Sequence, residues 1–384
     1  MTDLVELRRA IHAEPEIGLD LPATQRRVLD ALAPLDLEIT LGEGLSSVVA
    51  VLRGAHPGPV VLLRGDMDAL PLREETGLPY ASTNGAMHAC GHDLHTAGLV
   101  GAAHLLAARR ADLHGSVVFM FQPGEETGQG AALMIEEGVL DAAGRLPDAA
   151  YAVHVVPGER GVFSTRPGPL MAGALELRVS VRGQGGHASE PHQARNPVPA
   201  VTAAVDALHT FVTRRFSVFD PVVLTVTALS AGGPALNIIA EQAGFGGSVR
   251  VLSAESLARV RAEIPPLVES IAAAHGCTAE VDLDLVCPPT TNDEHLATEV
   301  LDVLRARFGE DRVRVTPEAV MGGEDFSHVL ARVPGVYFFL RATPPTAPQV
   351  SNHSPTASFD DSVLADQAAA LAALALRHLE GPTP

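Results

Sequence analysis

The sequence predicts an α/β protein in which helices flank a mixed or mostly parallel sheet, and in which a smaller α+β unit is inserted into the chain. Three observations support this fold class. Short apolar runs without polar alternation indicate strands covered on both faces, and long Ala- and Leu-rich stretches between them indicate the covering helices. Between residues 174 and 286 the predicted strands instead alternate apolar with polar residues. The 384 residues are also enough for more than one hydrophobic core.

The first part of the chain alternates predicted strands and helices. Leu4, Leu7 and Ile11 recur at helical spacing near the N-terminus. Apolar runs that end abruptly in polar clusters predict strands, and the same texture returns late in the chain. The strands are predicted at residues 60–63, 117–121, 149–153 and 335–340, and the helices at residues 97–110, 295–309 and 363–379. This order is typical of a doubly wound sheet, here in one domain made of residues 1–173 and 287–384.

The intervening segment, residues 174–286, predicts a second domain. Its elements follow the order β-α-β-β-α-β, which is a ferredoxin-like arrangement. The strands are predicted at 174–183, 222–229, 243–252 and 278–286, and the helices at 197–215 and 256–275. Pro265 and Pro266 interrupt the second helix pattern and leave the first half of that helix undefined.

Composition restricts the partners and the location of the protein. Lys and Arg number 27 against 46 Asp and Glu, so the net charge is −19, which repels nucleic-acid phosphates and anionic membrane surfaces. The N-terminus lacks the apolar core of a secretory signal, and the longest apolar runs are too short to span a bilayer. We therefore expect a cytoplasmic protein that binds neither nucleic acid nor membranes. Cys277 and Cys287, at opposite ends of one predicted strand, are expected to be reduced thiols.

Residues 87–97, MHACGHDLHTA, concentrate potential metal ligands in one short stretch. A zinc-binding helix of the H-E-x-x-H type would need glutamate at residue 89, which is alanine. Cys90 and His92 would point in different directions on a helix, whereas a turn containing Gly91 lets both converge on one point. Thiolate and imidazole together suit zinc or a related divalent metal. We expect this turn to precede a helix that begins after Asp93; the alternative is an incidental histidine-rich turn.

Other potential ligands follow the predicted strands at equivalent places. Because ligands of open α/β sheets gather beyond the carboxyl ends of the strands, these side chains are expected to lie together. The adjacent carboxylates of Glu125 and Glu126, in a Gly-flanked loop, can take different roles, since one can bind metal while the other takes a proton from a metal-activated water. The alternative for these two glutamates is an exposed acidic turn. The residues are Asp66 and Asp68 after the first apolar run, Glu125 and Glu126 after the second, and His154 after the third.

Further polar positions are weaker candidates. His353 is a single loop histidine after the last predicted strand, and it becomes a candidate ligand because a centre with two metals needs more ligands than the other segments supply. His95 is assigned to packing, or to orienting a ligand, before it is assigned to metal binding. Glu324 and Asp325 are expected to support the site through hydrogen bonds.

Several motifs occur along nearly the whole chain: LRRAIHAEPEIG, RGDMDALPL, MHACGHDLHTA, FQPGEETGQGA, the histidine of YAVHVVPG, GGHASEPHQARNPV, GGEDFS and SNHSP. In this order they resemble the M20 metallopeptidase family. They are most similar to its amidohydrolase branch, which includes hippurate hydrolases, N-acyl-amino-acid amidohydrolases, auxin-conjugate hydrolases and N-acetyldiaminopimelate deacetylases. The resemblance implies a zinc-peptidase-like catalytic domain and an inserted lid domain that also mediates dimerisation.

The same resemblance implies the residues of the active site. Glu125 would be the general base, Asp68 would orient a ligand, and His187 would stabilise the oxyanion, usually at the partner subunit's site. Two divalent ions, Zn, Mn, Co or Ni, would be bound by Cys90, His92, Glu126, His154 and His353.

Two positions of the lid domain match residues that the family associates with substrate contact. They are Asn237 in GGPALNIIA and Arg250 in GGSVR. A guanidinium can hold a free carboxylate with two parallel hydrogen bonds, which suits Arg250 to a substrate with an α-carboxylate. The alternative for Arg250 is an ion pair at the protein surface.

We therefore expect a metal-dependent amidohydrolase that cleaves the amide bond of N-acyl amino acids or related small amides, and that forms a homodimer or homotetramer through its lid domain. A dipeptidase of the same family remains an alternative, because peptide and acyl-amide bonds differ little at the reacting carbon. A metal-binding scaffold without turnover, the alternative from another class, would lack a ligand or the base, and this sequence has all of them. The sequence does not specify the acyl group, the amino acid or the metal.

Overall fold

The computed structural model describes residues 3–380, and the chain forms two compact units. The larger unit comprises Met1–Leu170, Thr291–Glu318 and Asp325–Pro384. The smaller unit comprises Met171–Thr290 and Ala319–Glu324. The chain enters the smaller unit at the short strand β7 (Gly168–Met171) and leaves it at β14 (Thr290–Asn292).

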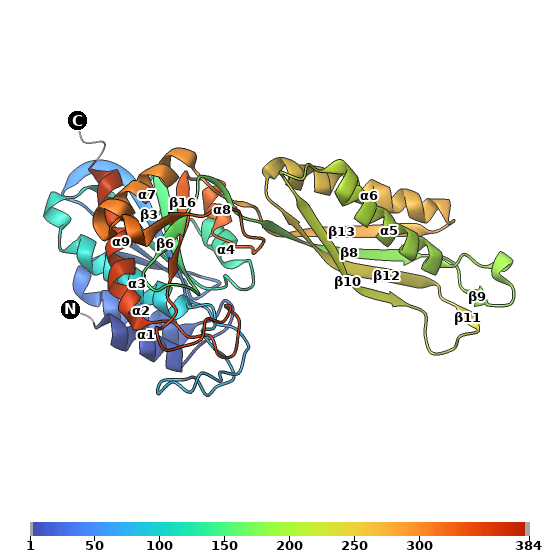
Figure 1. The fold of residues 1–384 in the computed structure, drawn as a ribbon, viewed down its shortest axis with the longest axis horizontal. Coiled ribbons are helices and arrows are strands. Elements are labelled where there is room, and N and C mark those ends of the chain that lie inside the picture. Colours follow the sequence, from blue (N-terminus) through green and yellow to red (C-terminus); the bar gives the residue numbers. More distant parts are fainter. Residues whose placement is uncertain (1–2, 381–384) are drawn as a thin grey trace. The chain divides into compact units, whose positions relative to one another are not determined.

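An eight-stranded mixed sheet forms the centre of the larger unit (Figure 1). β3 pairs in parallel with β4 and β5, and β5 pairs in parallel with β16, so the four central strands run in the same direction. This arrangement confirms the predicted α/β class with a mostly parallel sheet. In their order across the sheet, the strands are β1 (Glu38–Leu41), β2 (Val48–Arg53), β4 (His114–Gln122), β3 (His56–Asp66), β5 (Ala149–Val156), β16 (Gly335–Arg341), β6 (Phe163–Thr165) and β15 (Val313–Val315).

Helices cover this sheet, as the apolar strand patterns require. α3 is buried on nearly all sides, because it packs against α1, α9 and β3 at once. Its Ala- and Gly-rich sequence permits these close approaches. The α-helices of the larger unit are α1 (Leu4–Ala13), α2 (Pro22–Leu32), α3 (His92–Ala107), α4 (Gly130–Glu136), α7 (Glu294–Phe308), α8 (Ser327–Leu330) and α9 (Leu364–Leu379).

Buried polar residues collect at the carboxyl ends of the central strands. β3 ends with the buried Asp66, and β4 ends with the buried Gln122. His154 lies within β5 and not after it, so the predicted end of this strand at residue 153 is wrong. β5 continues to Val156 because the neighbouring strand β16 pairs with it as far as that residue. In this pairing Phe339 of β16 lies opposite His154. The parallel strands thus deliver polar side chains to one edge of the sheet.

The turn before α3 has the geometry that its glycine predicts. Gly91 has φ of +84°, a left-handed conformation that residues with a Cβ rarely adopt. A Cβ here would also lie 2.3 Å from a methyl carbon of Val155. The helix begins at His92, two residues before the predicted start after Asp93. The difference arises because the backbone N–H groups of Leu94 and His95 both donate to the Gly91 carbonyl, which closes the first turn earlier.

The smaller unit contains a four-stranded antiparallel sheet with two helices packed against it (Figure 1). Along the chain its main elements follow the predicted order β-α-β-β-α-β. They are β8 (Gly173–Arg182), α5 (Pro197–Arg215), β10 (Val222–Ala231), β12 (Gln242–Val251), α6 (Ala254–Ala274) and β13 (Thr278–Cys287). The order across the sheet is β10-β12-β8-β13. β9 (Gly186–His187) and β11 (Ile238–Ile239) form a separate two-stranded sheet. Residues 319–324 join this unit because the Ala172 N–H donates to the carbonyls of Val320 and Gly322.

α6 runs through both prolines that interrupt its sequence pattern. Pro265 and Pro266 lack the N–H groups that would bond to the carbonyls one turn earlier, so the helix loses two hydrogen bonds. Ser253 caps the first turn by accepting from the Ser256 N–H, and an apolar stripe is buried along the whole helix, both before and after the prolines. This stripe, which packs against the sheet and stabilises the first half of the helix, consists of Val260, Ile264, Val268 and Ala272.

Two general features complete the description. Over residues 3–380, Cys90, Cys277 and Cys287 are free thiols, as the spacing of the last two predicts. In that same part of the chain, none of the helices combines the length and the apolar character needed to cross a bilayer.

Substitution of Gly101 by Ala tests the packing of α3. A Cβ at this position would lie 2.8 Å from the Ala368 Cβ on α9 and 2.7 Å from a Leu4 methyl on α1. The replacement raises intrinsic helix propensity by about 1 kcal/mol. We nevertheless expect a net loss of about 1–3 kcal/mol of unfolding free energy from overpacking, measured by urea denaturation. Leu105→Ala, on the exposed side of the same helix, is the control, and a Gly101→Ala protein as stable as wild type would contradict the packing argument.

Candidate metal centre

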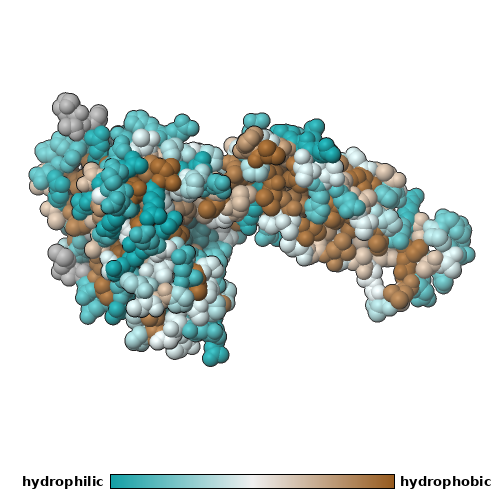
Figure 2. All heavy atoms as spheres, in the orientation of Figure 1, coloured by the Kyte–Doolittle hydropathy of each residue, from teal (hydrophilic) through white to brown (hydrophobic). Residues whose placement is uncertain are grey.

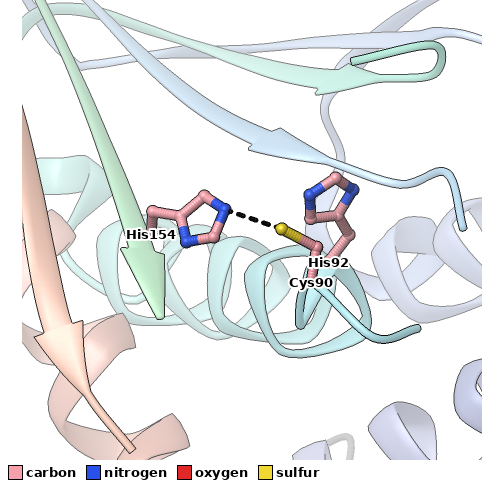
Figure 3. A group of neighbouring side chains, drawn as sticks. All are labelled: Cys90, His92 and His154. Carbon is pink, nitrogen blue, oxygen red and sulfur yellow. Dashed lines mark hydrogen bonds between the residues drawn. The ribbon is translucent and has the colours of Figure 1, made fainter. Parts of the chain in front are cut away.

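Donor atoms from distant segments of the larger unit converge at the carboxyl edge of its sheet. The potential ligand atoms of Cys90, His92 and His154 lie within 4.8 Å of one another (Figure 3). Those of Cys90, Glu126 and His353 form a second such group. Cys90 belongs to both triads, so its sulfur lies where the two groups meet. All five residues that the sequence proposes as ligands are therefore brought together by the fold.

The Cys90 sulfur is surrounded by imidazoles. Its Sγ lies 3.3 Å from the Nε2 of His154 and 3.3 Å from the Nε2 of His353. Burial raises the pKa of the Cys90 thiol, but its contacts with the neighbouring histidines outweigh burial and hold the pKa well below its usual value. The thiolate, which is the form that binds metals, is therefore favoured at this position.

His92 and His154 are oriented in the same way by backbone carbonyls. The Nδ1 of His92 lies 2.9 Å from the Asp68 carbonyl oxygen, and the Nδ1 of His154 lies 2.7 Å from the Val155 carbonyl oxygen. Because a carbonyl only accepts, each Nδ1 carries a proton, and each Nε2 is the ring nitrogen that faces the cluster and could bind a metal. The Nε2 of His92 is buried and has no hydrogen-bond partner among residues 3–380. A buried ring nitrogen without a partner, beside a thiolate, fits a site for a divalent metal.

The second triad is more open than the first. The His353 side chain is 53% exposed, and its Nε2 lies 3.2 Å from a Glu126 carboxylate oxygen. Hydrogen bonding to Cys90 and Glu126 raises the pKa of His353 to about 10. Burial raises the pKa of Glu126, although His353 opposes this effect. Metal would have to displace the proton held here, so metal affinity is expected to fall as pH falls.

Asp68 connects His92, a proposed ligand, to the two glutamates. Its carboxylate accepts hydrogen bonds of 3.0 Å from the backbone N–H groups of both Glu125 and Glu126. Gly124, which precedes the pair, has φ of +74°. The turn therefore has a fixed conformation, in which a Glu125 carboxylate oxygen lies 4.0 Å from the Nε2 of His92. Glu125 thus lies beside the donor cluster without belonging to either triad that contains Cys90.

A buried hydrogen-bond network joins Asp66, His95 and Asp325 through Arg64, a residue that the sequence analysis did not single out. Arg64 donates to Asp66 at 2.5 Å and to Asp325 at 3.1 Å. The Nδ1 of His95 lies 2.5 Å from the other Asp66 oxygen, and the Nε2 of His95 accepts from the Val155 N–H at 2.8 Å. Both nitrogens of His95 are therefore engaged, and the residue orients the end of β5 instead of offering a ligand. A charged residue inside the apolar run VVLLRGD was the signal that could have revealed Arg64.

The other sequence-predicted site residues lie in the smaller unit. His187 on β9 pairs with Ile238 on β11, and the Asn237 carbonyl accepts from the Ala188 N–H, so His187 and Asn237 are neighbours. The Nδ1 of His187 accepts from the Ser189 N–H at 3.1 Å, which leaves the proton on its Nε2. Arg250 lies on β12, in a different part of this unit.

Comparison with known proteins finds similarity along the whole chain. A sequence model described as Peptidase family M20/M25/M40 matches residues 62–377. Thermostable carboxypeptidase 1 of Saccharolobus solfataricus is 35% identical over 381 residues, which cover 97% of this chain and 95% of the relative. N-acetylcysteine deacetylase of Bacillus subtilis is 34% identical over 382 residues, with coverage of 99% and 97%. The crystal structure of a dinuclear metal-binding peptidase of the M20 family from Bacillus subtilis matches with a TM-score of 0.85, 31% identity and 98% coverage of each chain.

Alkylation of Cys90 tests whether its thiolate binds metal. Iodoacetamide should modify Cys90 in metal-free protein, because the neighbouring imidazoles favour the reactive thiolate. Saturating Zn²⁺ should protect it, and peptide mass spectrometry measures both rates. Cys277 and Cys287 are buried in other surroundings and serve as internal controls, since metal should not change their labelling. Equal labelling of Cys90 with and without Zn²⁺ would exclude it as a ligand.

Proposed function

Because the chain belongs to peptidase family M20/M25/M40, a family that contains metal-dependent hydrolases, we propose that it cleaves the amide bond of N-acyl amino acids or related small amides. The observation that carries the proposal is the convergence of two donor triads on the Cys90 sulfur, with Glu125 beside them.

We assign two divalent ions to these triads. His92 and His154 would complete one site and Glu126 and His353 the other, with Cys90 contributing to both. Such ions, when bound, polarise the acyl carbonyl and acidify a water molecule. Soft thiolate, borderline imidazole and hard carboxylate ligands together suit zinc, manganese, cobalt or nickel.

Glu125 is the general base in this mechanism. Its carboxylate takes a proton from the attacking water and later delivers it to the nitrogen of the leaving amine. Asp68 acts as a positioning residue, because its carboxylate holds the backbone of the Glu125 turn while its carbonyl orients His92. One aspartate thereby sets the distance between the base and a proposed ligand.

Residues of the smaller unit are proposed to recognise the substrate and the transition state. His187, with its proton on Nε2, can donate a hydrogen bond to the oxyanion that develops during attack. Arg250 can hold the α-carboxylate of the amino acid with two parallel hydrogen bonds. Asn237 is proposed to contact substrate because it lies beside His187.

Self-association is proposed through the smaller unit, as a homodimer or homotetramer. β10 is an edge strand of its sheet, and Val223 and Leu229 on this strand are 43% and 56% exposed. Hydrophobic residues are also visible among hydrophilic ones on the surface of this unit in Figure 2. An exposed edge with apolar side chains is a template for pairing with another chain. Light scattering of the purified protein measures the oligomeric state.

The alternatives have different signatures. A dipeptidase would have to accommodate a free, charged amino terminus, and the relative named as a carboxypeptidase keeps peptide bonds among the candidate substrates. A metal-binding protein without turnover would keep the triads and show no hydrolysis. The relative named as a deacetylase favours acyl amides for this chain.

Replacement of Glu125 by Gln tests the base. We expect kcat to fall by about 10²–10⁴-fold, because the amide keeps the size of the side chain and cannot accept the proton. The metal content should remain that of wild type, measured by elemental analysis of the same preparation. Glu126→Gln is the matched control, since it should instead lower the metal content. Full turnover by the Glu125→Gln protein would remove Glu125 from the mechanism.

A substrate panel tests the proposed specificity. N-acetyl and N-benzoyl amino acids, their carboxamides and free dipeptides should be compared with each metal restored in turn. We expect the acids to exceed their carboxamides by about 10-fold or more in kcat/KM, because a charge-assisted hydrogen bond contributes about 1.5–3 kcal/mol. Faster cleavage of free dipeptides would favour the dipeptidase, and no turnover of any substrate with any metal would favour the scaffold.

A further inference from the structure

We propose that Arg8 is a positioning residue for the metal centre, because it joins the segment that carries His92 to the segment that carries His353. The inference rests on the metal centre proposed above. Arg8 contacts none of the proposed ligands directly, so it acts through the segments that hold them.

The guanidinium of Arg8 binds three separate segments. It is fully buried on α1, and its Nε donates to an Asp93 carboxylate oxygen at 2.6 Å. Its Nη1 donates to the Tyr80 hydroxyl at 2.8 Å and to an Asp361 carboxylate oxygen at 2.9 Å. Asp93 immediately follows His92, whereas Asp361 follows His353 by eight residues in the short 3₁₀ helix Asp361–Val363. One side chain therefore bridges the two regions that supply His92 and His353.

Stability alone does not account for an arginine at this position. Removing a guanidinium from water costs several kcal/mol, and a buried ion pair is often no more stabilising than apolar residues of the same volume. A guanidinium differs from an apolar side chain in its rigid fork of donors, which sets the directions of several partners at once. The geometry points to control of position as the property that Arg8 contributes.

His12, one turn after Arg8, extends the same contacts to a further loop. Its Nδ1 lies 2.7 Å from the Asp93 carboxylate and its Nε2 lies 3.1 Å from the Glu74 carboxylate. The next residue, Glu75, donates its N–H to the Pro355 carbonyl at 2.8 Å. The loop bound by α1 thus also contacts the segment of His353. α1 therefore holds that segment through two routes, one by Arg8 and one by His12.

His353 depends on this anchoring more than His92 does. The backbone of His353 has φ of +66°, a conformation that is unfavourable for a residue with a Cβ and that persists only when its surroundings impose it. Its N–H donates to the Ala89 carbonyl at 3.1 Å, and its side chain is half exposed. His92 is fully buried and is held by the Asp68 carbonyl and by its place in α3. Loss of the Arg8 bridge should therefore weaken the triad of Cys90, Glu126 and His353 selectively.

Titration of metal-free protein with Co²⁺ tests this inference. The thiolate-to-cobalt absorption band and chelator competition report the affinity of each equivalent. Arg8→Lys keeps the charge but replaces the fork with a single ammonium, and Asp361→Ala removes the other end of the bridge at a position near the surface. For both variants we expect the first equivalent to bind as in wild type, and the second to bind about 10–100-fold more weakly.

The controls separate this inference from a general loss of structure. Arg27→Met breaks an ion pair with Glu14 outside these segments, and it should leave both affinities unchanged. Circular dichroism and thermal unfolding of the metal-free proteins report the fold. If Arg8→Lys does not fold, Asp361→Ala decides the question together with Arg9→Met, which removes the other ion pair of Asp361 and should leave both affinities unchanged. An unchanged second affinity, or equal weakening of both equivalents, would overturn the positioning of His353 by Arg8. Fewer than two equivalents bound by wild type would instead refute the metal centre itself, and the inference with it.

Discussion

The site depends on one constraint, which is that a single sulfur atom has to lie between imidazoles from different segments of the chain. Cys90 Sγ is 3.3 Å from the Nε2 atoms of both His154 and His353. The three residues are separated by 64 and 199 positions in the sequence, so local structure cannot place them together. Parallel strands solve this problem, because their carboxyl ends and the loops that follow meet at one edge of the sheet. The central sheet is in this sense the support of the metal centre.

A second group of hydrogen bonds gives the donor atoms their directions. Backbone carbonyls orient His92 and His154, and the Asp68 carboxylate binds the turn that carries Glu125 and Glu126. These partners lie on strands or directly beside them, where the backbone has little freedom. Ligand orientation of this kind sets the tautomer of each imidazole and contributes substantially to metal affinity. The proposed base and the proposed ligands are consequently parts of one rigid unit.

Two buried arginines join segments of this arrangement to one another. Arg64 joins the ends of neighbouring strands to Asp325, and Arg8 joins the first turn of α3 to Asp361. Both are almost completely shielded from water. Because a buried guanidinium is costly unless all its partners are in place, each arrangement is either complete or strongly disfavoured. Such networks favour one relative position of the segments they join, and here those segments carry the donor atoms.

The sequence by itself determined the local features. Apolar runs, helical spacing and the Gly91 turn predicted the sheet, its covering helices, the β-α-β-β-α-β unit and the turn that carries Cys90 and His92. The full set of candidate donors through His353 was implied by the resemblance of the motifs to the M20 family. The strands and helices follow from the spacing of apolar residues along the chain and from backbone preferences, which are properties of residues close together in sequence. Only the tertiary structure decided that Cys90 is shared by two triads, that α6 continues through Pro265 and Pro266, and that Arg8 bridges two distant segments. The physical reason is that each of these depends on packing or charge between residues far apart in the chain, where a local pattern carries no information about the partner.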